Sequence, residues 1–378
     1  MNQANQTRTN ETHANESPSP RKVRVLLVDD SAVMLSLLRM VLEPQRSIEI
    51  AGTASNGQEA LAAFENLHPD LVLLDIEMPG MNGLEALSSI RLRNRRTPVI
   101  MCSTLTSRGA RITIEALARG ATDYVCKPGA QHGIREGVET LTRDLLPKIL
   151  ALFPAEPRPG AASAVPDPRP ALPASSSLPP RLVVIGVSTG GPAALEALLP
   201  KIPAAFPLPI LIVQHMPRLF TGLLAERLNG LCPLRVREAA SDTRPEAGVI
   251  DIARGDFHLE LTRDMRLRLN QNEPENFCRP SVDVLFRSAA LACSGRLLGI
   301  ILTGMGSDGL AGCRAIRSAG GAVLAQDSAT SVIWGMPGAV VHAGLANKVL
   351  ALEAIPAEIL RCTAPPAPHA PRPEAIAL

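Results

Sequence analysis

The stretch VRVLLVDDS, residues 23–31, decides the fold of the first half of the chain. Its apolar run is typical of a buried strand, and Asp29 and Asp30 follow directly. Outward from it, short apolar runs alternate with helical patterns. The further strands are expected at residues 48–51, 71–74, 99–102 and 124–126. Strands that alternate with helices in this way predict a parallel α/β sheet.

A second alternation of strands and helices begins with LVVI at residues 182–185. It predicts a second α/β parallel-sheet domain, with further strands at residues 210–213, 249–252, 298–302 and 322–325. Between the halves, residues 154–180 contain nine prolines among many Ala and Ser. A segment of this composition cannot bury a core, so we expect an extended spacer.

These patterns divide the chain into five expected segments. They are a disordered polar tail (1–20), a first α/β domain (21–145), a Pro/Ala-rich linker (146–180), a second α/β domain (181–363) and a C-terminal tail (364–378).

Composition excludes several classes of protein. Aromatic residues make up only 2% of the chain, so the cores must consist of Leu, Ile, Val and Ala. The formal net charge is +2 without a long basic block, which argues against nucleic acid as the main partner. Seven cysteines without a C-x-x-C pair are typical of reduced thiols, and we see neither a secretory signal nor an apolar run of membrane length. We therefore expect a cytoplasmic protein that is not inserted in a membrane.

Five polar side chains are predicted to meet at one edge of the first sheet. Asp29, Asp30 and Asp75 follow the first and third strands, Ser103 ends the fourth strand, and Lys127 ends the fifth. Three carboxylates together favour a cation between them, and an all-oxygen site suits Mg²⁺. Such a carboxylate can attack a phosphoryl donor, while the hydroxyl and the ammonium hold the new phosphoryl oxygens.

Residues 22–145 resemble the response-regulator receiver family. The resemblance rests on VDDS (28–31), LDIEMP (74–79) with Gly83, and YVCKP (124–128). It implies a flavodoxin-like, doubly wound parallel sheet and phosphorylation of Asp75 by a histidine kinase. It also implies that Asp30, Asp75 and the backbone carbonyl of Glu77 bind Mg²⁺, with Asp29 assisting.

In the second half, GVSTGGP at residues 186–192 follows a strand and opens a helix. The glycines allow a tight turn that exposes Ser188 at a helix N-terminus, and the pattern matches a nucleophile elbow. A loop of this kind could equally hold a phosphate. His215 and Asp308, which follow later strands, distinguish these alternatives, because a base and its orienting carboxylate would activate the hydroxyl. The order Ser, His, Asp disfavours the α/β-hydrolase fold.

Other residues are weaker candidates. Asp327 also follows a strand and stays open as an alternative acidic member of the triad. Trp334 is expected to pack under the site. Two histidines are expected to be surface or partly buried residues, and three cysteines to be small packing residues: His258, His342, Cys278, Cys293 and Cys313.

Residues 182–360 resemble the catalytic domain of the chemotaxis protein-glutamate methylesterases. The resemblance rests on STGG (188–191), QHMP (214–217), RPSVDVLF (279–286), LTGMGSDG (302–309), AQD (325–327) and WGMPG (334–338). It implies Ser188 as nucleophile, His215 as base, Asp308 as its orienter, the Met305 N–H as oxyanion donor and Thr189 in the active site. The chain departs from the family pattern at residues 250–256 and at Val187, which precedes Ser188, but neither departure falls on a residue of the triad.

The resemblance further implies hydrolysis of glutamate methyl esters and deamidation of glutamine on methyl-accepting chemoreceptors, without a cofactor for the esterase. Two rival hypotheses are a non-catalytic receptor-binding regulator and a transcriptional regulator. The intact set of Ser188, His215 and Asp308 argues against the first. The second would need a basic helix-turn-helix, which the sequence does not contain. We expect the unphosphorylated first domain to cover the cleft of the second.

Overall fold

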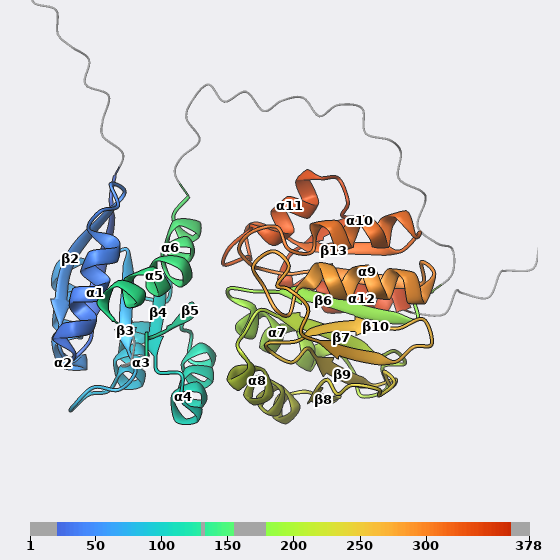
Figure 1. Cartoon of the computed structure of the whole chain (residues 1–378), viewed down its shortest axis with the longest axis horizontal. Helices are drawn as coiled ribbons and strands as arrows, with labels where there is room; N and C mark the ends of the chain where they lie inside the picture. The colour runs from blue at the N-terminus through green and yellow to red at the C-terminus, as the bar shows by residue number, and fades with distance from the viewer. Residues whose placement is uncertain (1–20, 130–132, 155–178, 364–378) are drawn as a thin grey trace, which may run out of the picture.

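The computed structural model describes residues 21–129, 133–154 and 179–363 (Figure 1). The predicted tails (1–20 and 364–378) and most of the predicted linker lie outside the described residues.

The first domain contains a parallel sheet with the strand order β2-β1-β3-β4-β5 among the described residues. This is the predicted flavodoxin-like, doubly wound arrangement, in which the strand order reverses between β1 and β3. The strands are β1 (Val23–Val28), β2 (Ile48–Ala54), β3 (Leu71–Asp75), β4 (Val99–Ser103) and β5 (Asp123–Cys126). The helices are α1 (Ala32–Leu42), α2 (Gly57–Leu67), α3 (Gly83–Arg93), α4 (Ser107–Ala118), α5 (Ile134–Asp144) and α6 (Leu146–Leu152).

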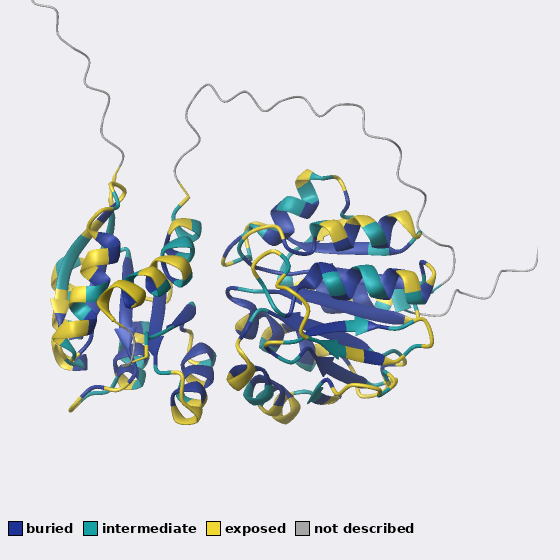
Figure 2. Ribbon diagram, in the orientation of Figure 1, coloured by how far each residue is buried: buried dark blue, intermediate teal, exposed yellow. Residues whose placement is uncertain are grey.

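Local sequence explains where these elements begin. Ser31 directly follows the acidic pair, and its hydroxyl accepts a hydrogen bond from the Met34 N–H, so it caps α1. Asn82 and Glu85 form a capping box that begins α3 directly after the loop beyond Asp75. Every residue of β3 and β4 is buried, as expected for strands covered by helices on both faces (Figure 2).

The expected start of the linker at residue 146 is wrong. Residues Leu146–Leu152 form α6, and Ile149 is fully buried in the same core as α1 and α5. The Lys148 ammonium donates hydrogen bonds to Asp123 Oδ2 and to the Tyr124 carbonyl, which ties α6 to β5. The proline signal begins only at Pro154, so the apolar run before it belongs to the first domain.

The second domain contains a parallel sheet with the order β14-β13-β12-β6-β7-β9-β8 among the described residues, and an antiparallel pair, β10-β11. The strands are β6 (Leu182–Val187), β7 (Ile210–Gln214), β8 (Arg235–Glu238), β9 (Val249–Ile252), β10 (His258–Leu261), β11 (Leu267–Asn270), β12 (Leu297–Ile301), β13 (Ala322–Gln326) and β14 (Lys348–Leu350). The helices are α7 (Gly191–Leu198), α8 (Arg218–Leu231), α9 (Val282–Cys293), α10 (Leu310–Ser318), α11 (Met336–His342) and α12 (Ile355–Thr363), with short 3₁₀ turns η1 (Leu199–Lys201) and η2 (Leu352–Ala354).

The five strands predicted for this domain are present, whereas β8, β10, β11 and β14 were not predicted. β8 carries charged residues at both ends and β14 has three residues, so neither forms an apolar run. β6 lies between β7 and β12, where the chain reverses its direction across the sheet. The loops after these three strands therefore surround the crevice in which α/β sheets place their sites.

Candidate active site

Ser188 and His215 are neighbours because their strands are neighbours. β6 and β7 pair in parallel with Val187 opposite Gln214, so the next residue of each strand lies at the same sheet edge. The His215 N–H donates to the Val187 carbonyl over 3.2 Å, and the Ser188 N–H donates to the Thr303 carbonyl after β12 over 3.0 Å. Three loops thus meet at Ser188, as the sequence predicted.

Glycines make this convergence possible. Gly190 ends the nucleophile turn with φ 77°, a left-handed conformation that favours glycine. Gly304 lies against the turn from the other side, and a Cβ there would be 2.8 Å from Ser188 Cβ. A side chain at residue 304 would therefore displace the candidate nucleophile.

His215 and Asp308 form a hydrogen-bonded pair, with 2.8 Å between His215 Nε2 and Asp308 Oδ2. Asp308 is only 3% exposed. Its carboxylate also accepts hydrogen bonds from Asn276 Nδ2 and Ser281 Oγ before α9, and from the N–H groups of Val282 and Asp283 in the first turn of α9. The Gly309 N–H donates to it as well. Burial pushes the pKa of Asp308 upward, but these donors and His215 outweigh it and hold the pKa at about 2. The group is therefore a carboxylate at neutral pH.

The charge of Asp308 fixes the tautomer of His215. An ionised carboxylate only accepts hydrogen bonds, so Nε2 must carry a proton and Nδ1 is left as the basic nitrogen. Burial alone would lower the pKa of His215, but the contacts with Asp308 and Cys278 together outweigh it and raise the pKa well above its ordinary value. The pair is arranged to stabilise an imidazolium.

Nδ1 lies 3.6 Å from the Cys278 sulfur. The prediction that Cys278 is a packing residue is wrong, because its thiol contacts the candidate base. The Ser188 hydroxyl makes no side-chain hydrogen bond with a residue that the structure describes, so the contact between nucleophile and base is not formed in this state. Catalytic hydrogen bonds often tighten only when substrate binds.

The remaining candidates have structural partners. Asp327 Oδ1 accepts from the backbone and hydroxyl of Thr330, which removes it as the alternative triad member. His258 is buried and bonds the Ser281 N–H and the Glu273 carbonyl. His342 packs edge-on against Trp334, whose indole N–H donates to the Gln326 carbonyl.

Thr189, next to the candidate nucleophile, reaches the other domain. Its hydroxyl donates a 2.7 Å hydrogen bond to Asp123 Oδ2 of β5, and both side chains are buried. Beside this bond, Tyr124 stacks on Phe220 with ring centroids 4.6 Å apart. Helix α4 packs against α7 and α8, which follow the loops that carry Ser188 and His215 (Figure 1). The two domains therefore touch within one residue of Ser188, a contact that sequence patterns do not reveal.

The predicted acidic pocket is present in the first domain. Asp29, Asp30 and Asp75 each place a carboxylate oxygen within 4.8 Å of the others. Lys127 Nζ lies 2.7 Å from Asp29 Oδ2 and 2.8 Å from Asp75 Oδ1. Burial raises the pKa of Asp75 to about 6, although Lys127 opposes the shift. Asp29 Oδ2 is buried and has no hydrogen-bond partner among the described residues beyond this ion pair.

These residues fit Mg²⁺, because the three side-chain donors are all carboxylate oxygens, and only the Lys127 ammonium pairs with the buried Asp29 Oδ2 among the described residues. Ser103 is fully buried at the end of β4 and is turned toward α4. Its Oγ accepts a 2.7 Å hydrogen bond from Thr113 Oγ1 rather than contacting Asp75.

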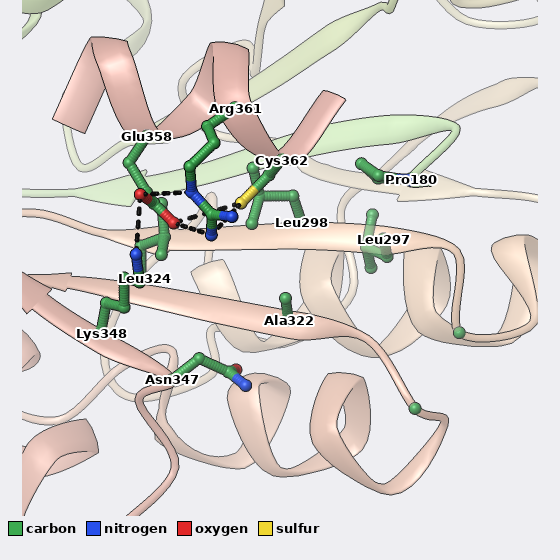
Figure 3. A pocket seen from close by; sticks show the side chains of 12 residues that line it. Pro180, Leu297, Leu298, Ala322, Leu324, Asn347, Lys348, Glu358, Arg361 and Cys362 are labelled. Atoms are coloured by element: carbon green, nitrogen blue, oxygen red, sulfur yellow. Dashed lines mark hydrogen bonds and ion pairs between the residues drawn. The ribbon is translucent and has the colours of Figure 1, made fainter. Parts of the chain in front are cut away.

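A cavity of about 370 Å³ lies elsewhere, at the amino ends of β12 and β13 beside α12 (Figure 3). Its polar lining is an ion cluster in which Glu358 accepts from Lys348 and Arg361. Parallel α/β sheets place their chemistry at the opposite, carboxyl edge, where Ser188, His215 and Asp308 lie. We therefore assign the site to the carboxyl edge.

Comparison with known proteins agrees with this division of the chain. Residues 25–139 match the response regulator receiver domain family, and residues 183–359 match the CheB methylesterase family. A protein-glutamate methylesterase/protein-glutamine glutaminase from a Nocardioides species is 48% identical, over 90% of this chain and 95% of that protein. A protein of the same name from Trichodesmium erythraeum is 45% identical, over 90% of this chain and 99% of that protein.

Among solved structures, the CheB methylesterase catalytic domain of Thermotoga maritima is 40% identical. The match covers 49% of this chain and 99% of the Thermotoga maritima domain, with a TM-score of 0.47. None of the helices in the part of the chain that the structure describes combines the length and apolar character needed to cross a membrane.

Proposed function

The chain belongs to the CheB methylesterase family, and on this premise we propose that it hydrolyses glutamate methyl esters and deamidates glutamines on chemoreceptors, under the control of its own receiver domain. The observation that carries the proposal is the His215–Asp308 pair at the edge of β7, beside Ser188 at the edge of β6. This set supports acyl transfer by a serine nucleophile.

The geometry supports the following proposed roles. Ser188 Oγ attacks the ester carbonyl while its proton passes to His215 Nδ1, and Asp308 stabilises the resulting imidazolium through Nε2. His215 then returns the proton to the leaving oxygen, and methanol departs. Water attacks the acyl-enzyme with His215 again as base, which releases the glutamate carboxylate and restores Ser188. With glutamine, ammonia leaves in place of methanol.

The oxyanion that develops in these steps needs nearby N–H donors. Met305 is half-buried in the loop after β12, the same loop whose Thr303 carbonyl accepts from the Ser188 N–H. We propose the Met305 N–H as a donor to the oxyanion, which is typically worth about 10²–10³-fold in rate. The adjacent Gly304 allows this loop to approach Ser188.

In the receiver domain we propose Asp75 as the phosphorylated residue and a histidine kinase as the phosphodonor. Asp30, Asp75 and the Glu77 carbonyl would hold Mg²⁺ with the help of Asp29. When bound, the ion neutralises carboxylate and phosphoryl oxygens. Lys127, which already contacts Asp29 and Asp75, would hold one phosphoryl oxygen.

The receiver would control the hydrolase through the contact at Thr189. A phosphoryl group on Asp75 attracts the Ser103 hydroxyl, which then gives up its hydrogen bond with Thr113 on α4. Helix α4 packs against α7 and α8, so a change in its position loosens the interface beside the nucleophile. A change of about 1.4 kcal/mol in docking free energy shifts the open population about tenfold.

The activity is tested by methanol release from a methylated receptor and ammonia release from a receptor carrying the corresponding glutamines. Both products are expected, and His215→Gln should abolish both together. Ammonia release that survives in His215→Gln would contradict a shared mechanism. For the control step, the fragment 181–378 should release methanol faster than the unphosphorylated full chain. A folded fragment that is no faster would contradict the proposal that the receiver covers the cleft beside Ser188.

A further inference from the structure

The hydrolase centre contains a second set of converging metal-ligand atoms besides the acidic pocket. His215, Cys278 and Asp308 each offer one ligand atom, and these nitrogen, sulfur and oxygen atoms all lie within 4.8 Å of one another. The esterase reaction proposed above uses His215 and Asp308, but it gives the cysteine no task. The presence of a thiol against the basic nitrogen therefore needs its own explanation.

Cys278 is held in place by a strained turn. Glu275 and Cys278 exchange backbone hydrogen bonds of 3.2 and 3.0 Å, and the two residues between them, Asn276 and Phe277, have φ values of 54° and 60°. Two successive left-handed residues define the tight turn of a hairpin, and a bulky residue such as Phe rarely adopts this conformation. Backbone strain of this kind persists only where the surroundings enforce it.

The surroundings of the turn do enforce it. The Arg287 guanidinium forms a two-pronged ion pair with the Glu275 carboxylate, with distances of 2.5 and 2.6 Å. The Asn276 amide donates to Asp308 Oδ1 over 2.8 Å. The same carboxylate that orients His215 thus also anchors the turn that presents Cys278, so the three ligands are positioned by one network.

The donor set selects a different ion from the receiver pocket. A thiolate with an imidazole and a carboxylate suits Zn²⁺ and similar borderline cations, whereas three carboxylates suit Mg²⁺. A centre with three protein ligands leaves a fourth position for water. The His215 side chain is 12% exposed and Cys278 is half-buried, while the neighbouring Phe277 is fully exposed. A small cation can therefore reach the cluster from the surface.

We propose that His215, Cys278 and Asp308 bind a zinc-like divalent cation that reversibly inhibits the hydrolase. On binding, the cation takes the place of the proton between His215 Nε2 and Asp308 Oδ2, and that proton moves to Nδ1. The Cys278 thiol releases its proton to solvent and its sulfur forms a bond to the cation. With Nδ1 protonated, His215 can no longer accept the Ser188 proton. Metal binding and ester hydrolysis are thus mutually exclusive. Inhibition rests on the proposed function, whereas binding does not.

Binding is tested on the full-length protein with Co²⁺ alone, whose absorption reports a thiolate ligand. Wild type should develop a thiolate-to-cobalt band that Zn²⁺ displaces. Cys278→Ser should lack the band, and Cys232→Ser, which alters another half-buried cysteine of the hydrolase domain, should keep it. Cobalt held by the receiver carboxylates would not produce this band. A wild type without the band, or a Cys278→Ser variant that retains it, would overturn the site.

Inhibition is tested by methanol release without phosphodonor, with each variant compared with its own metal-free rate. Zinc should inhibit wild type and Cys232→Ser, and a chelator should restore the rate. The zinc concentration for half inhibition should rise by about tenfold or more in Cys278→Ser. Equal zinc sensitivity in the three proteins would overturn the proposal. A cobalt band in a protein that releases no methanol would instead contradict the proposed function and leave the metal site standing.

Discussion

The acidic pocket of the receiver and the catalytic centre of the hydrolase occupy equivalent positions in their sheets but contain different side chains. Both lie at the carboxyl edge of a parallel sheet, and each gathers three ligand-type side chains within 4.8 Å. The receiver pocket contains three carboxylates and a lysine, so it suits a hard cation and a phosphoryl group. The hydrolase centre contains an imidazole, a carboxylate, a thiol and a neighbouring hydroxyl, so it suits proton transfer and acyl chemistry.

The comparison teaches that sheet topology decides where chemistry occurs, and that the side chains at the strand ends decide which chemistry. The two sites are also connected through direct contacts between the domains. Asp123 and Tyr124 belong to the receiver strand β5, three to four residues before Lys127, and they contact Thr189 and Phe220 of the hydrolase. The link between the sites is an ordinary packing interface.

The sharpest way to separate the two sites is Ser188→Ala. Without the hydroxyl there is no nucleophile, so methanol release should fall by about 10⁴-fold or more. Phosphorylation of the receiver should be unchanged, because the variant residue lies in the other domain. Both activities are measured on the same preparation. Methanol release close to the wild-type rate would contradict the assignment of the nucleophile.

The reciprocal change is Asp75→Asn, which keeps the shape of the side chain and removes its charge. Incubation with a small phosphodonor and Mg²⁺ should label wild type and leave the variant unlabelled. Without metal or phosphodonor, the esterase rate of the variant should stay within about twofold of the wild-type rate. A chelator should abolish the wild-type label as well. Persistent label in Asp75→Asn would show that the acidic pocket is not the acceptor site.

A smaller effect is expected where the two regions touch. Asp123→Ala removes the acceptor of the Thr189 hydrogen bond, which is worth about 1–1.5 kcal/mol, so basal methanol release should rise about five- to tenfold. Arg111→Ala is the matched control, because it removes a 3.8 Å ion pair to Glu226 whose side chains are both 68% exposed. Such pairs contribute little, and less than a twofold change is expected. Equal rates in the two variants would argue against the Asp123 contact as a restraint.

The smallest effect is predicted at the amino edge of the hydrolase sheet, away from both sites. The hydrogen bond from Arg361 lowers the pKa of Glu358 from 4.5 to about 2. Burial opposes this shift, and the hydrogen bond from Lys348 adds to it. Because the folded value is the lower one, the stabilisation is present above pH 4.5 and is lost as the pH falls toward 2. Glu358→Gln should reduce stability by about 1 kcal/mol at neutral pH.

The measurement is the difference in melting temperature between wild type and Glu358→Gln, which should narrow as the pH falls below 4.5. Methanol release should be unaffected at neutral pH. A loss of esterase activity that matches that of Ser188→Ala would mean that the chemistry is not confined to the carboxyl edge.

Sequence reasoning predicted the strands that carry the sites, because each is an apolar run followed by a polar residue. It also predicted that Ser188, His215 and Asp308 lie at one sheet edge, because parallel strands bring their carboxyl ends together. In the structure His215 bonds Asp308, whereas the triad roles stay a prediction. It missed the charged strand β8 and the three-residue strand β14, which pack at the sheet's edges and are too polar or too short to form an apolar run. It also extended the linker into α6, whose burial depends on tertiary contact with α1 and α5.

Two features of the site could not be predicted from local sequence patterns. Cys278 lies 63 residues from His215, and only the strained turn at Asn276 and Phe277 directs it to the imidazole. The bond between Thr189 and Asp123 joins two domains separated by the linker, and nothing in either segment indicates the other. Such long-range contacts depend on packing rather than on periodicity.

We propose that phosphorylation of the receiver relieves a restraint on the hydrolase beside Ser188. The most direct test is methanol release from methylated receptor by the full-length chain, measured before and after addition of a small phosphodonor with Mg²⁺. We expect a rise of about tenfold, which should be absent in Asp75→Asn. Equal rates before and after the phosphodonor, in a protein shown to be phosphorylated, would contradict it.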